Sequence, residues 1–268
     1  GPGRSNNKND MSLRKDILDK YYYHHINLEE CAKHFNVGSK FIYYLIQKDK
    51  NNSNNDKLEI ICKYNKNIYK ITLNQKLLVR DYIPYLLTNK CLDILDKIIH
   101  NTSHKLKIFH SPDNRSDKNH VLKKEKKETN EEYKKRAIKE NFVYPMQATS
   151  VQIVYSSKKC KNQNDKKILM SRSGYLKPFY DDGIIGIGGD CFACLVSSKD
   201  EAYKIIDLLN SKLYKFYIET NKWSGFHNKE VLQDLPNIIN DIEVINDNNI
   251  NTYFNLSDKE IKLIEENV

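Results

Sequence analysis

The sequence has no long hydrophobic run. Its longest apolar stretches, such as Ile68–Leu73, are interrupted by polar residues within a few positions. A membrane-spanning helix needs about 18 consecutive apolar residues, and no signal peptide is recognisable at the start of the chain. The pattern therefore argues against membrane insertion and secretion and predicts an intracellular protein, in the cytoplasm or the nucleus.

The sequence also lacks a cysteine framework. Of its six cysteines, only Cys191 and Cys194 have the spacing of a metal-binding pair, and no second pair completes a zinc site. These two lie in an apolar run, Cys-Phe-Ala-Cys, which favours a buried strand over a ligand pair. We therefore expect no bound metal at this pair, and reduced thiols that suit an intracellular compartment.

Common catalytic motifs are missing as well. The sequence contains no readable Ser/His/Asp set for nucleophilic catalysis and no glycine-rich loop of the kind that cradles phosphates. What is present is a chain of 268 residues, 39% hydrophobic and 29% charged. That length suits one large domain or two modest ones. We expect a buried core beneath a heavily charged surface.

The charge is uneven along the chain. Residues 1–110 contain 19 basic and 11 acidic residues, residues 237–268 contain 2 and 7, and the net charge of the chain is +9. A basic body with 18 tyrosines suits a polyanionic partner, above all double-stranded DNA. The alternative explanation is codon bias, because Lys, Asn, Ile and Tyr are all abundant, as an AT-rich genome would give.

The pattern of residues 27–48 is typical of a helix-turn-helix. Asn27 and Glu30 have capping-box spacing and open a short helix. Gly38 lies in a turn, and Ser39 can cap a second helix in which apolar residues recur four positions apart. In a DNA-binding motif the second helix enters the major groove, whereas an ordinary helical hairpin is the alternative. The candidate DNA contacts on this helix are Lys40, Tyr44, Gln47 and Lys48.

The rest of the chain alternates between strand and helix patterns. Strands are expected at 58–64 and 67–73 and a helix at 80–100, which together suit a winged-helix or small α+β module. Residues 111–140 hold 17 charged residues out of 30 and are interpreted as a linker that ends in a surface helix. A long helix is expected after Ser198. Further strands are predicted at 151–155, 167–170 and 192–197.

Three clusters in the second half of the chain form a larger pattern. They are Ser171–Gly183 (SRSGYLKPFYDDG), Leu209–Leu213 (LNSKL) and Lys222–Asn228 (KWSGFHN), and a Leu-Pro follows the last of them. In this order and at this spacing, the clusters resemble the C-terminal target recognition (TaqI-like specificity) domain of adenine-specific DNA methyltransferases and of fused restriction–modification enzymes. The resemblance covers about residues 141–236.

The resemblance implies that these clusters read DNA. Arginine gives bidentate contacts to guanine, while hydroxyl groups and lysine suit phosphates. The structural alternative is that the aromatic residues pack in a core and that Asp181-Asp182-Gly183 is a turn and not a metal site. The candidate DNA contacts of the first cluster are Arg172, Ser173, Tyr175 and Lys177. Those of the third cluster are Lys222, Ser224, His227 and Asn228.

The chain departs from this family at the point where methyl transfer would need it most. Methyltransferases of the family carry a glycine-containing cofactor loop and an Asn/Asp-Pro-Pro-Tyr/Phe motif, and neither occurs in this sequence. We therefore expect no cofactor in this chain. S-adenosylmethionine would enter only through a separate catalytic core, in a partner chain or an upstream region.

A nuclease is the alternative enzyme. Restriction nucleases use Pro-Asp followed by Glu-x-Lys to hold Mg²⁺ and orient water. Asp113, Glu125 and Lys127 match that string formally. In such nucleases the carboxylates lie on core strands, whereas these residues lie in a charged segment that is poor in apolar residues. That setting favours a solvated charged run.

Together these patterns predict an α+β protein, with an N-terminal helix-turn-helix or winged-helix-like module and a mixed α/β target recognition domain. The leading function is sequence-specific binding of double-stranded DNA, as the recognition part of a modification or restriction system with a methyltransferase or nuclease chain as a candidate partner. A DNA endonuclease with its catalytic half in 51–140 and a non-catalytic scaffold are the alternatives. The expected divisions are a tag or disordered leader at 1–10, the helix-turn-helix-like module at 11–110, the linker at 111–140, the recognition domain at 141–236 and an acidic, flexible tail at 237–268.

Overall fold

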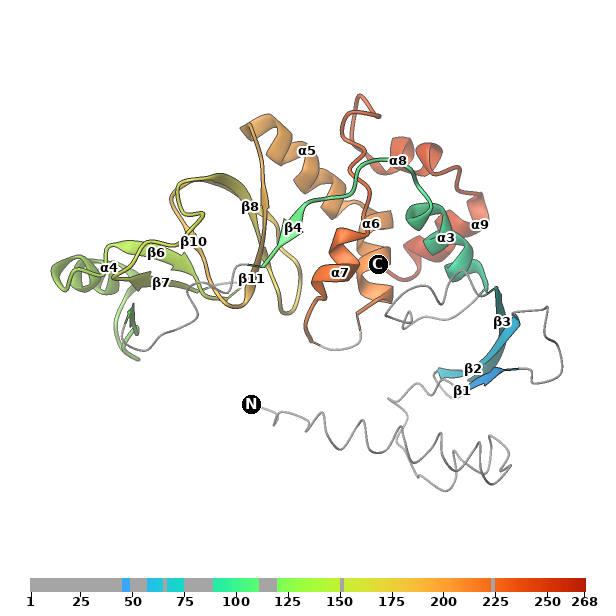
Figure 1. Ribbon diagram of the computed structural model, residues 1–268, viewed down its shortest axis with the longest axis horizontal. Helices are drawn as coiled ribbons and strands as arrows, with labels where there is room; N and C mark the ends of the chain where they lie inside the picture. Colours follow the sequence, from blue (N-terminus) through green and yellow to red (C-terminus); the bar gives the residue numbers. More distant parts are fainter. Residues whose placement is uncertain are drawn as a thin grey trace, which may run out of the picture. The chain divides into compact units, whose positions relative to one another are not determined.

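The structure is a computed structural model that describes residues 45–48, 57–64, 67–74, 89–110, 120–149, 152–222 and 225–268. For the first three of these ranges it describes the backbone alone. The chain divides into two compact units, Gly1–Asp81 and Tyr82–Val268 (Figure 1). This division falls inside the module expected at 11–110. The leader expected at 1–10 lies outside the described residues.

The described part of the first unit is an antiparallel sheet with the strand order β1-β2-β3. Strands β2 (Lys57–Tyr64) and β3 (Asn67–Asn74) pair along their whole length. The two strands predicted from the alternation of residues 58–73 are therefore confirmed.

Strand β1 (Leu45–Lys48) corrects part of the predicted helix-turn-helix. It pairs antiparallel with β2, where the sequence predicted the end of a recognition helix. A short apolar run rich in branched and aromatic residues fits both the helical and the strand period, and pairing with a neighbour decides between them. Gln47 and Lys48 thus belong to a strand. Lys40, Tyr44 and the rest of the motif lie outside the described residues.

The second unit is built on an antiparallel sheet with the order β4-β11-β8-β9. Its middle strands are buried on both faces. In β8, Ile168 and Met170 join a large apolar cluster with the helices, while Leu169 joins a smaller cluster on the opposite face. Burial on both faces explains why these strands have nearly continuous apolar sequences. The strands are β4 (Ile108–Phe109), β8 (Lys166–Ser171), β9 (Phe179–Asp182) and β11 (Cys191–Leu195).

Cys191 and Cys194 lie on opposite faces of β11. Cys194 belongs to the large cluster and Cys191 to the smaller one, and both are buried free thiols. The buried strand expected at this pair is confirmed. Burial raises the pKa of Cys191 to about 12 and that of Cys194 to about 11, so both thiols stay protonated at neutral pH.

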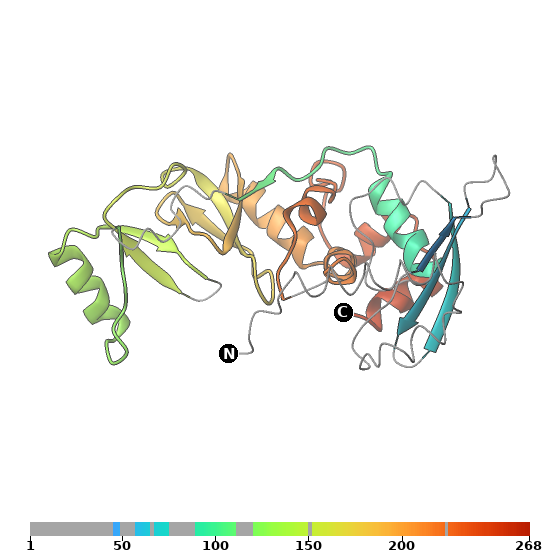
Figure 2. The ribbon, with the colours of Figure 1, turned by 60° about the horizontal axis from the view of Figure 1, so that its bottom comes forward.

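Helices lie on the side of the sheet that carries the large cluster, some directly on its strands and others packed against those helices (Figure 2). The sequence pattern predicted a single long helix after Ser198. Its start is confirmed, because the Ser198 hydroxyl accepts the backbone N–H of Glu201. Among the described residues, no helix is both long and apolar enough to span a bilayer. The helices are α3 (Asn89–Ile99), α5 (Lys199–Asn210), α6 (Lys212–Thr220), α7 (Lys229–Gln233), α8 (Asp247–Tyr253) and α9 (Asp258–Glu265).

The expected long helix is in fact two helices, α5 and α6, joined at Ser211. Ser211 has extended backbone angles (φ −62°, ψ 153°), which end α5 and start α6. Its hydroxyl donates to the carbonyl of Leu208 at 2.7 Å and accepts the N–H of Tyr214 at 3.4 Å. Serine competes with the helical backbone in this way, so the break is encoded locally even though the apolar pattern continues through it.

Residues 237–268 are also not the flexible tail that was expected. They carry α8 and α9, and the side chains of Ile250, Phe254 and Ile264 are buried in the large cluster. Lys97 on α3 contacts the carboxylate of Glu260 on α9 at 2.8 Å. Most apolar residues of the segment contribute to the core, whereas Val244 and Val268 are exposed.

A second sheet, with the order β10-β6-β7-β5, borders the smaller cluster. Ile187 on β10 packs there against Leu169 of β8 and against Cys191 and Ala193 of β11. Part of the predicted linker is therefore ordered, since β5 and α4 fall within 111–140 and the surface helix predicted there is confirmed. The elements are β5 (Val121–Leu122), α4 (Asn130–Lys139), β6 (Tyr144–Gln147), β7 (Ile153–Ser156) and β10 (Gly186–Ile187).

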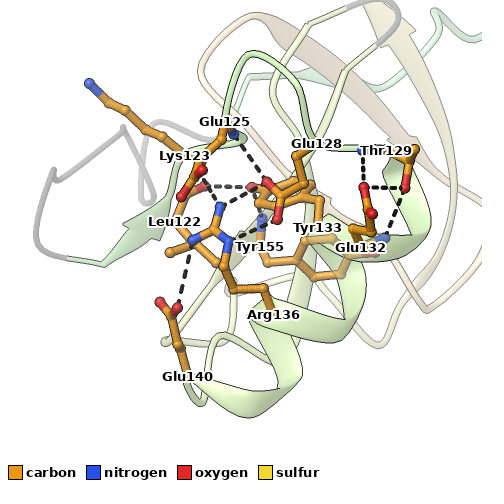
Figure 3. Close-up of polar contacts among 10 residues, drawn as sticks. All are labelled: Leu122, Lys123, Glu125, Glu128, Thr129, Glu132, Tyr133, Arg136, Glu140 and Tyr155. Carbon is orange, nitrogen blue, oxygen red and sulfur yellow. Dashed lines mark hydrogen bonds and ion pairs between the residues drawn. The ribbon is translucent and has the colours of Figure 1, made fainter.

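Two side chains of α4 fasten it to this sheet (Figure 3). Arg136 donates Nε–H to Glu128 Oε1 at 2.8 Å and Nη2–H to Oε2 at 2.9 Å. The same Nη2 reaches the carbonyl of Lys123 at 2.8 Å. The Tyr133 hydroxyl donates to the carbonyl of Leu122 on β5. Pairing with Arg136 lowers the pKa of Glu128 to about 2, so this charge pair persists into acid.

Candidate nucleic-acid interface

Two loops that are distant in sequence meet at the end of the sheet β4-β11-β8-β9. One is the β8–β9 connection, with Arg172, Ser173 and Gly174, and the other precedes α7. Ser173 and Phe226 form an isolated antiparallel bridge. Beside it, the N–H of Gly174 donates to the carbonyl of Gly225 at 3.1 Å, and the N–H of His227 donates to the carbonyl of Arg172 at 2.7 Å. The structure thus joins the first and third sequence clusters into one platform, which we call the paired loops (171–177 and 225–228).

The carbonyl of Gly174 is the centre of this junction. It accepts hydrogen bonds from the ammonium group of Lys222 and from Nε2 of His227, the latter at 2.9 Å. Gly174 itself has φ +67°, a left-handed conformation that glycine adopts without steric cost. The glycine is therefore needed for the direction of the backbone, and the two donors fix that direction.

The backbone of residues 172–174 is saturated by internal hydrogen bonds. The N–H of Arg172 donates to the carbonyl of Asp190 at 2.8 Å. The Ser171 hydroxyl donates to the carbonyl of Ser173 at 2.6 Å and accepts its N–H at 3.2 Å. With the contacts of Gly174, every backbone N–H and carbonyl of the three residues has a partner. No backbone N–H of these three residues is left to donate to a ligand.

The side chains that project from the paired loops are basic and aromatic. Tyr175 is 78% exposed and Phe226 is 52% exposed. Arg172 is half-buried, and its guanidinium carbon lies 5.6 Å from the centre of the Phe226 ring. Lys177 is exposed and has φ +44°, an uncommon conformation for lysine. The arrangement offers donors and ring faces on a rigid support.

Not all predicted contacts face outward. His227 is only 4% exposed and holds Gly174 from behind. Burial is the main cause that lowers the pKa of His227 to about 4, aided by the charge of Lys222, so its ring is neutral at pH 7. Lys222 has a side chain that is 13% exposed and engaged with Gly174 and Glu219. Both residues organise the loops, and their role as DNA contacts stays a prediction.

The other two candidates of the third cluster have different positions. Asn228 is exposed, and its side-chain oxygen accepts the N–H of Glu230 at 3.2 Å as the N-cap of α7. Ser224 lies outside the described residues, as does Trp223, so the structural alternative for this aromatic residue, a core position, stays untested.

The acidic pair forms the end of β9, where the sequence predicted a turn, and the chain bends only at Gly183, which has φ +80°. Asp181 also binds a lysine. Asp181 Oδ1 accepts the N–H groups of Ile184 and Ile185, and Oδ2 lies 2.6 Å from Nζ of Lys167. Lys167 is fully buried and also donates to the carbonyls of Gln163 and Asp165. The three N–H donors of the ammonium group are thus satisfied. In the sequence, Lys167 is the first residue of the strand predicted at 167–170, and nothing in the pattern indicated that it would be buried.

The residues that formally match a nuclease string do not form a described site. Glu125 and Lys127 are exposed in the turn before α4, where the N–H of Glu125 donates to Glu128 Oε2 at 3.0 Å. Asp113 lies outside the described residues. Within the part of the chain that the structure describes, no three His, Cys, Asp or Glu residues gather as metal ligands would.

Phe226 is the residue of this surface that sequence reasoning did not select. It was visible within the third cluster, but an aromatic residue in a sequence indicates a core position as readily as an exposed one. Comparison with known proteins adds no further guide, since no family model matches the chain and no curated protein is detectably similar to it.

Proposed function

We propose that this chain binds a specific sequence of double-stranded DNA through the paired loops, as the recognition part of a DNA modification or restriction system. One observation supports the proposal above the others. A backbone with no free hydrogen-bonding groups at 172–174 holds Arg172, Tyr175 and Lys177 at a surface, where their side chains are the parts left to meet a ligand.

The chemistry of these side chains matches the parts of a duplex. A guanidinium group can donate two parallel hydrogen bonds to the O6 and N7 atoms of guanine, and lysine suits phosphate oxygens. Preorganisation matters because ordering a flexible side chain or loop during binding costs free energy. The paired loops are ordered by their own hydrogen bonds before any ligand arrives.

The reaction that such recognition would serve belongs to a second component. Because this chain lacks the motifs of the methyltransferases that its second half resembles, we propose that a separate methyltransferase or nuclease polypeptide or region supplies the catalytic centre. S-adenosylmethionine or Mg²⁺ would then bind to that component. The contribution of this chain is to choose the DNA site.

The proposal is tested by selecting bound duplexes from a random library with the wild-type chain and with Arg172→Ala. We expect the wild type to enrich a motif. The variant should lose about 5- to 150-fold of the discrimination at one base position, which corresponds to roughly 1–3 kcal/mol. Its free energy of unfolding should change by less than about 1 kcal/mol, because the contact of Arg172 with Phe226 is a surface cation–π pair.

Lys204→Ala is the matched control, since it removes one exposed positive charge from α5. It should leave the selected motif unchanged. Failure of the wild type to enrich any motif, or an unchanged motif with Arg172→Ala, would overturn the proposed function. Unfolding of Arg172→Ala in a melting experiment would show that the side chain is structural.

A further inference from the structure

We propose that Phe226 is a positioning residue that sets base specificity by holding the guanidinium of Arg172. The inference rests on the proposed function and extends it to a residue to which that function assigns no contact with a base. The inference is based on two observations. The guanidinium carbon of Arg172 lies 5.6 Å from the centre of the Phe226 ring. The residues before and after Phe226 form backbone hydrogen bonds with the opposite loop.

The backbone of Phe226 is fixed from both directions. The carbonyl of Gly225 accepts the N–H of Gly174, and the N–H of His227 donates to the carbonyl of Arg172. Phe226 itself stands opposite Ser173 in the bridge. The backbones of Phe226 and Arg172 are therefore held beside each other, which keeps the ring within reach of the arginine side chain.

The exposure of Phe226 favours this role over a purely structural one. A phenylalanine that is 52% exposed keeps about half of its surface in water and contributes less to folding than a buried ring. Its ring face attracts a guanidinium by a cation–π interaction of about 0.5–1 kcal/mol at an exposed site. Guanidinium stacked on a ring keeps its N–H donors in the plane, where they can still form two parallel hydrogen bonds.

The side chains of Lys222 and His227 stabilise the pairing of the two loops. Both donate to the carbonyl of Gly174, the residue that follows Ser173 in the bridge. If the loops slid past each other, Phe226 would no longer face Arg172. The clasp at Gly174 therefore keeps the ring and the guanidinium in register.

The test compares Phe226→Leu, which removes the ring face, with Phe226→Tyr, which keeps it. In duplex-binding assays we expect Phe226→Leu to lower the discrimination at the base position read by Arg172 by about 2- to 5-fold, the equivalent of the cation–π contact. Affinity for random duplex should be unchanged. Phe226→Tyr should restore wild-type discrimination.

Tyr203→Leu is the matched control. Tyr203 on α5 is 49% exposed and lies 5.7 Å from Nζ of Lys199, so it is a similar cation–ring pair outside the paired loops. Its removal should leave discrimination intact. A second readout needs no DNA, because the NMR signal of the Arg172 side chain should lose its ring-current shift in Phe226→Leu and keep it in Phe226→Tyr.

The outcomes separate this inference from the proposed function. A wild-type motif that Phe226→Leu reads with undiminished discrimination would overturn the positioning role and leave DNA reading in place. An unaltered Arg172 NMR signal in Phe226→Leu would overturn it as well. Absence of any motif with the wild type would overturn the proposed function, whatever the NMR result.

Discussion

Lys167 and His227 are two basic side chains that the fold removes from water in opposite ways. Lys167 is buried beside the carboxylate of Asp181 and two backbone carbonyls, so a negative charge faces the positive one. His227 is buried beside the ammonium group of Lys222 and one carbonyl, and burial favours its neutral form. Burying a charge is tolerated where a partner of opposite sign is built in, and is avoided where none is.

The environment of His227 predicts how stability depends on pH. Its pKa is about 4 in the folded chain and about 6.5 in the unfolded chain, so between these values the unfolded chain binds more protons. The free energy of unfolding should therefore fall as the pH is lowered from about 6.5 to about 4. Urea unfolding across this range checks the slope, and His227→Gln should flatten it.

Glu128 provides the contrast for that measurement. Its lowered pKa, near 2, makes its contribution disappear only below about pH 4.5, so its window lies under that of His227. A wild-type stability that stays flat from pH 6.5 to 4, or an equal slope in His227→Gln, would refute the assignment.

At the scale of elements, α4 depends on a hydroxyl group. The hydroxyl of Tyr133 donates to the carbonyl of Leu122 and accepts the N–H of Tyr155, and those two residues face each other across β5 and β7. Tyr133→Phe leaves both backbone groups without this partner, and we expect a loss of about 1–3 kcal/mol in the free energy of unfolding. Chemical denaturation measures it.

Tyr144→Phe on β6 is the control for this change, since it removes a hydroxyl from a half-buried tyrosine of the same sheet. It should cost less than Tyr133→Phe. Equal effects of the two substitutions would show that the hydroxyl of Tyr133 does not bridge the strands.

The elements also show what the sequence could predict. The hairpin of β2 and β3, the helix α4 and the start of α5 follow from periodicity and capping residues, which act over a few positions. Two-residue strands such as β4 and β5 have no period to read, because only their partners define them. The predicted helix at Leu45–Lys48 was wrong for the same reason, since pairing with β2 overrides a local preference.

The candidate site was only partly predictable. The exposed Tyr175 and Lys177 agree with what loop chemistry predicted, whereas Asp181 belongs to β9 and not to the predicted turn. The inward positions of Lys222 and His227 depend on the carbonyl of Gly174, which is about 50 residues away in the chain. No local pattern carries a contact of that range. Phe226 was missed for the same reason, because the residue that it contacts, Arg172, is distant in the sequence.

At the scale of the whole molecule, the C-terminal 32 residues belong to the main core. Ile238, Ile250 and Phe254 are buried with the helices that precede them. We expect a chain that ends at residue 236 to lose cooperative thermal unfolding, because several buried apolar side chains are removed at once and each contributes about 1.5–3 kcal/mol. Circular dichroism melting and limited proteolysis check this.

Removal of residues 266–268 alone is the control, since all three are exposed. That shorter deletion should melt like the full chain. A chain ending at 236 that unfolds cooperatively near the wild-type temperature would show that α8 and α9 are dispensable.

The clasp at Gly174 has a consequence for how new specificities can arise. Because Lys222 and His227 donate hydrogen bonds to the first loop and Gly174 donates one to the second, neither segment can be transplanted alone. An exchange of residues 171–177 that replaces Gly174 would strain the φ +67° backbone whose carbonyl accepts hydrogen bonds from Lys222 and His227. The two segments therefore form one discontinuous structural unit. A chimaera that keeps this surface folded has to carry both segments from the same parent.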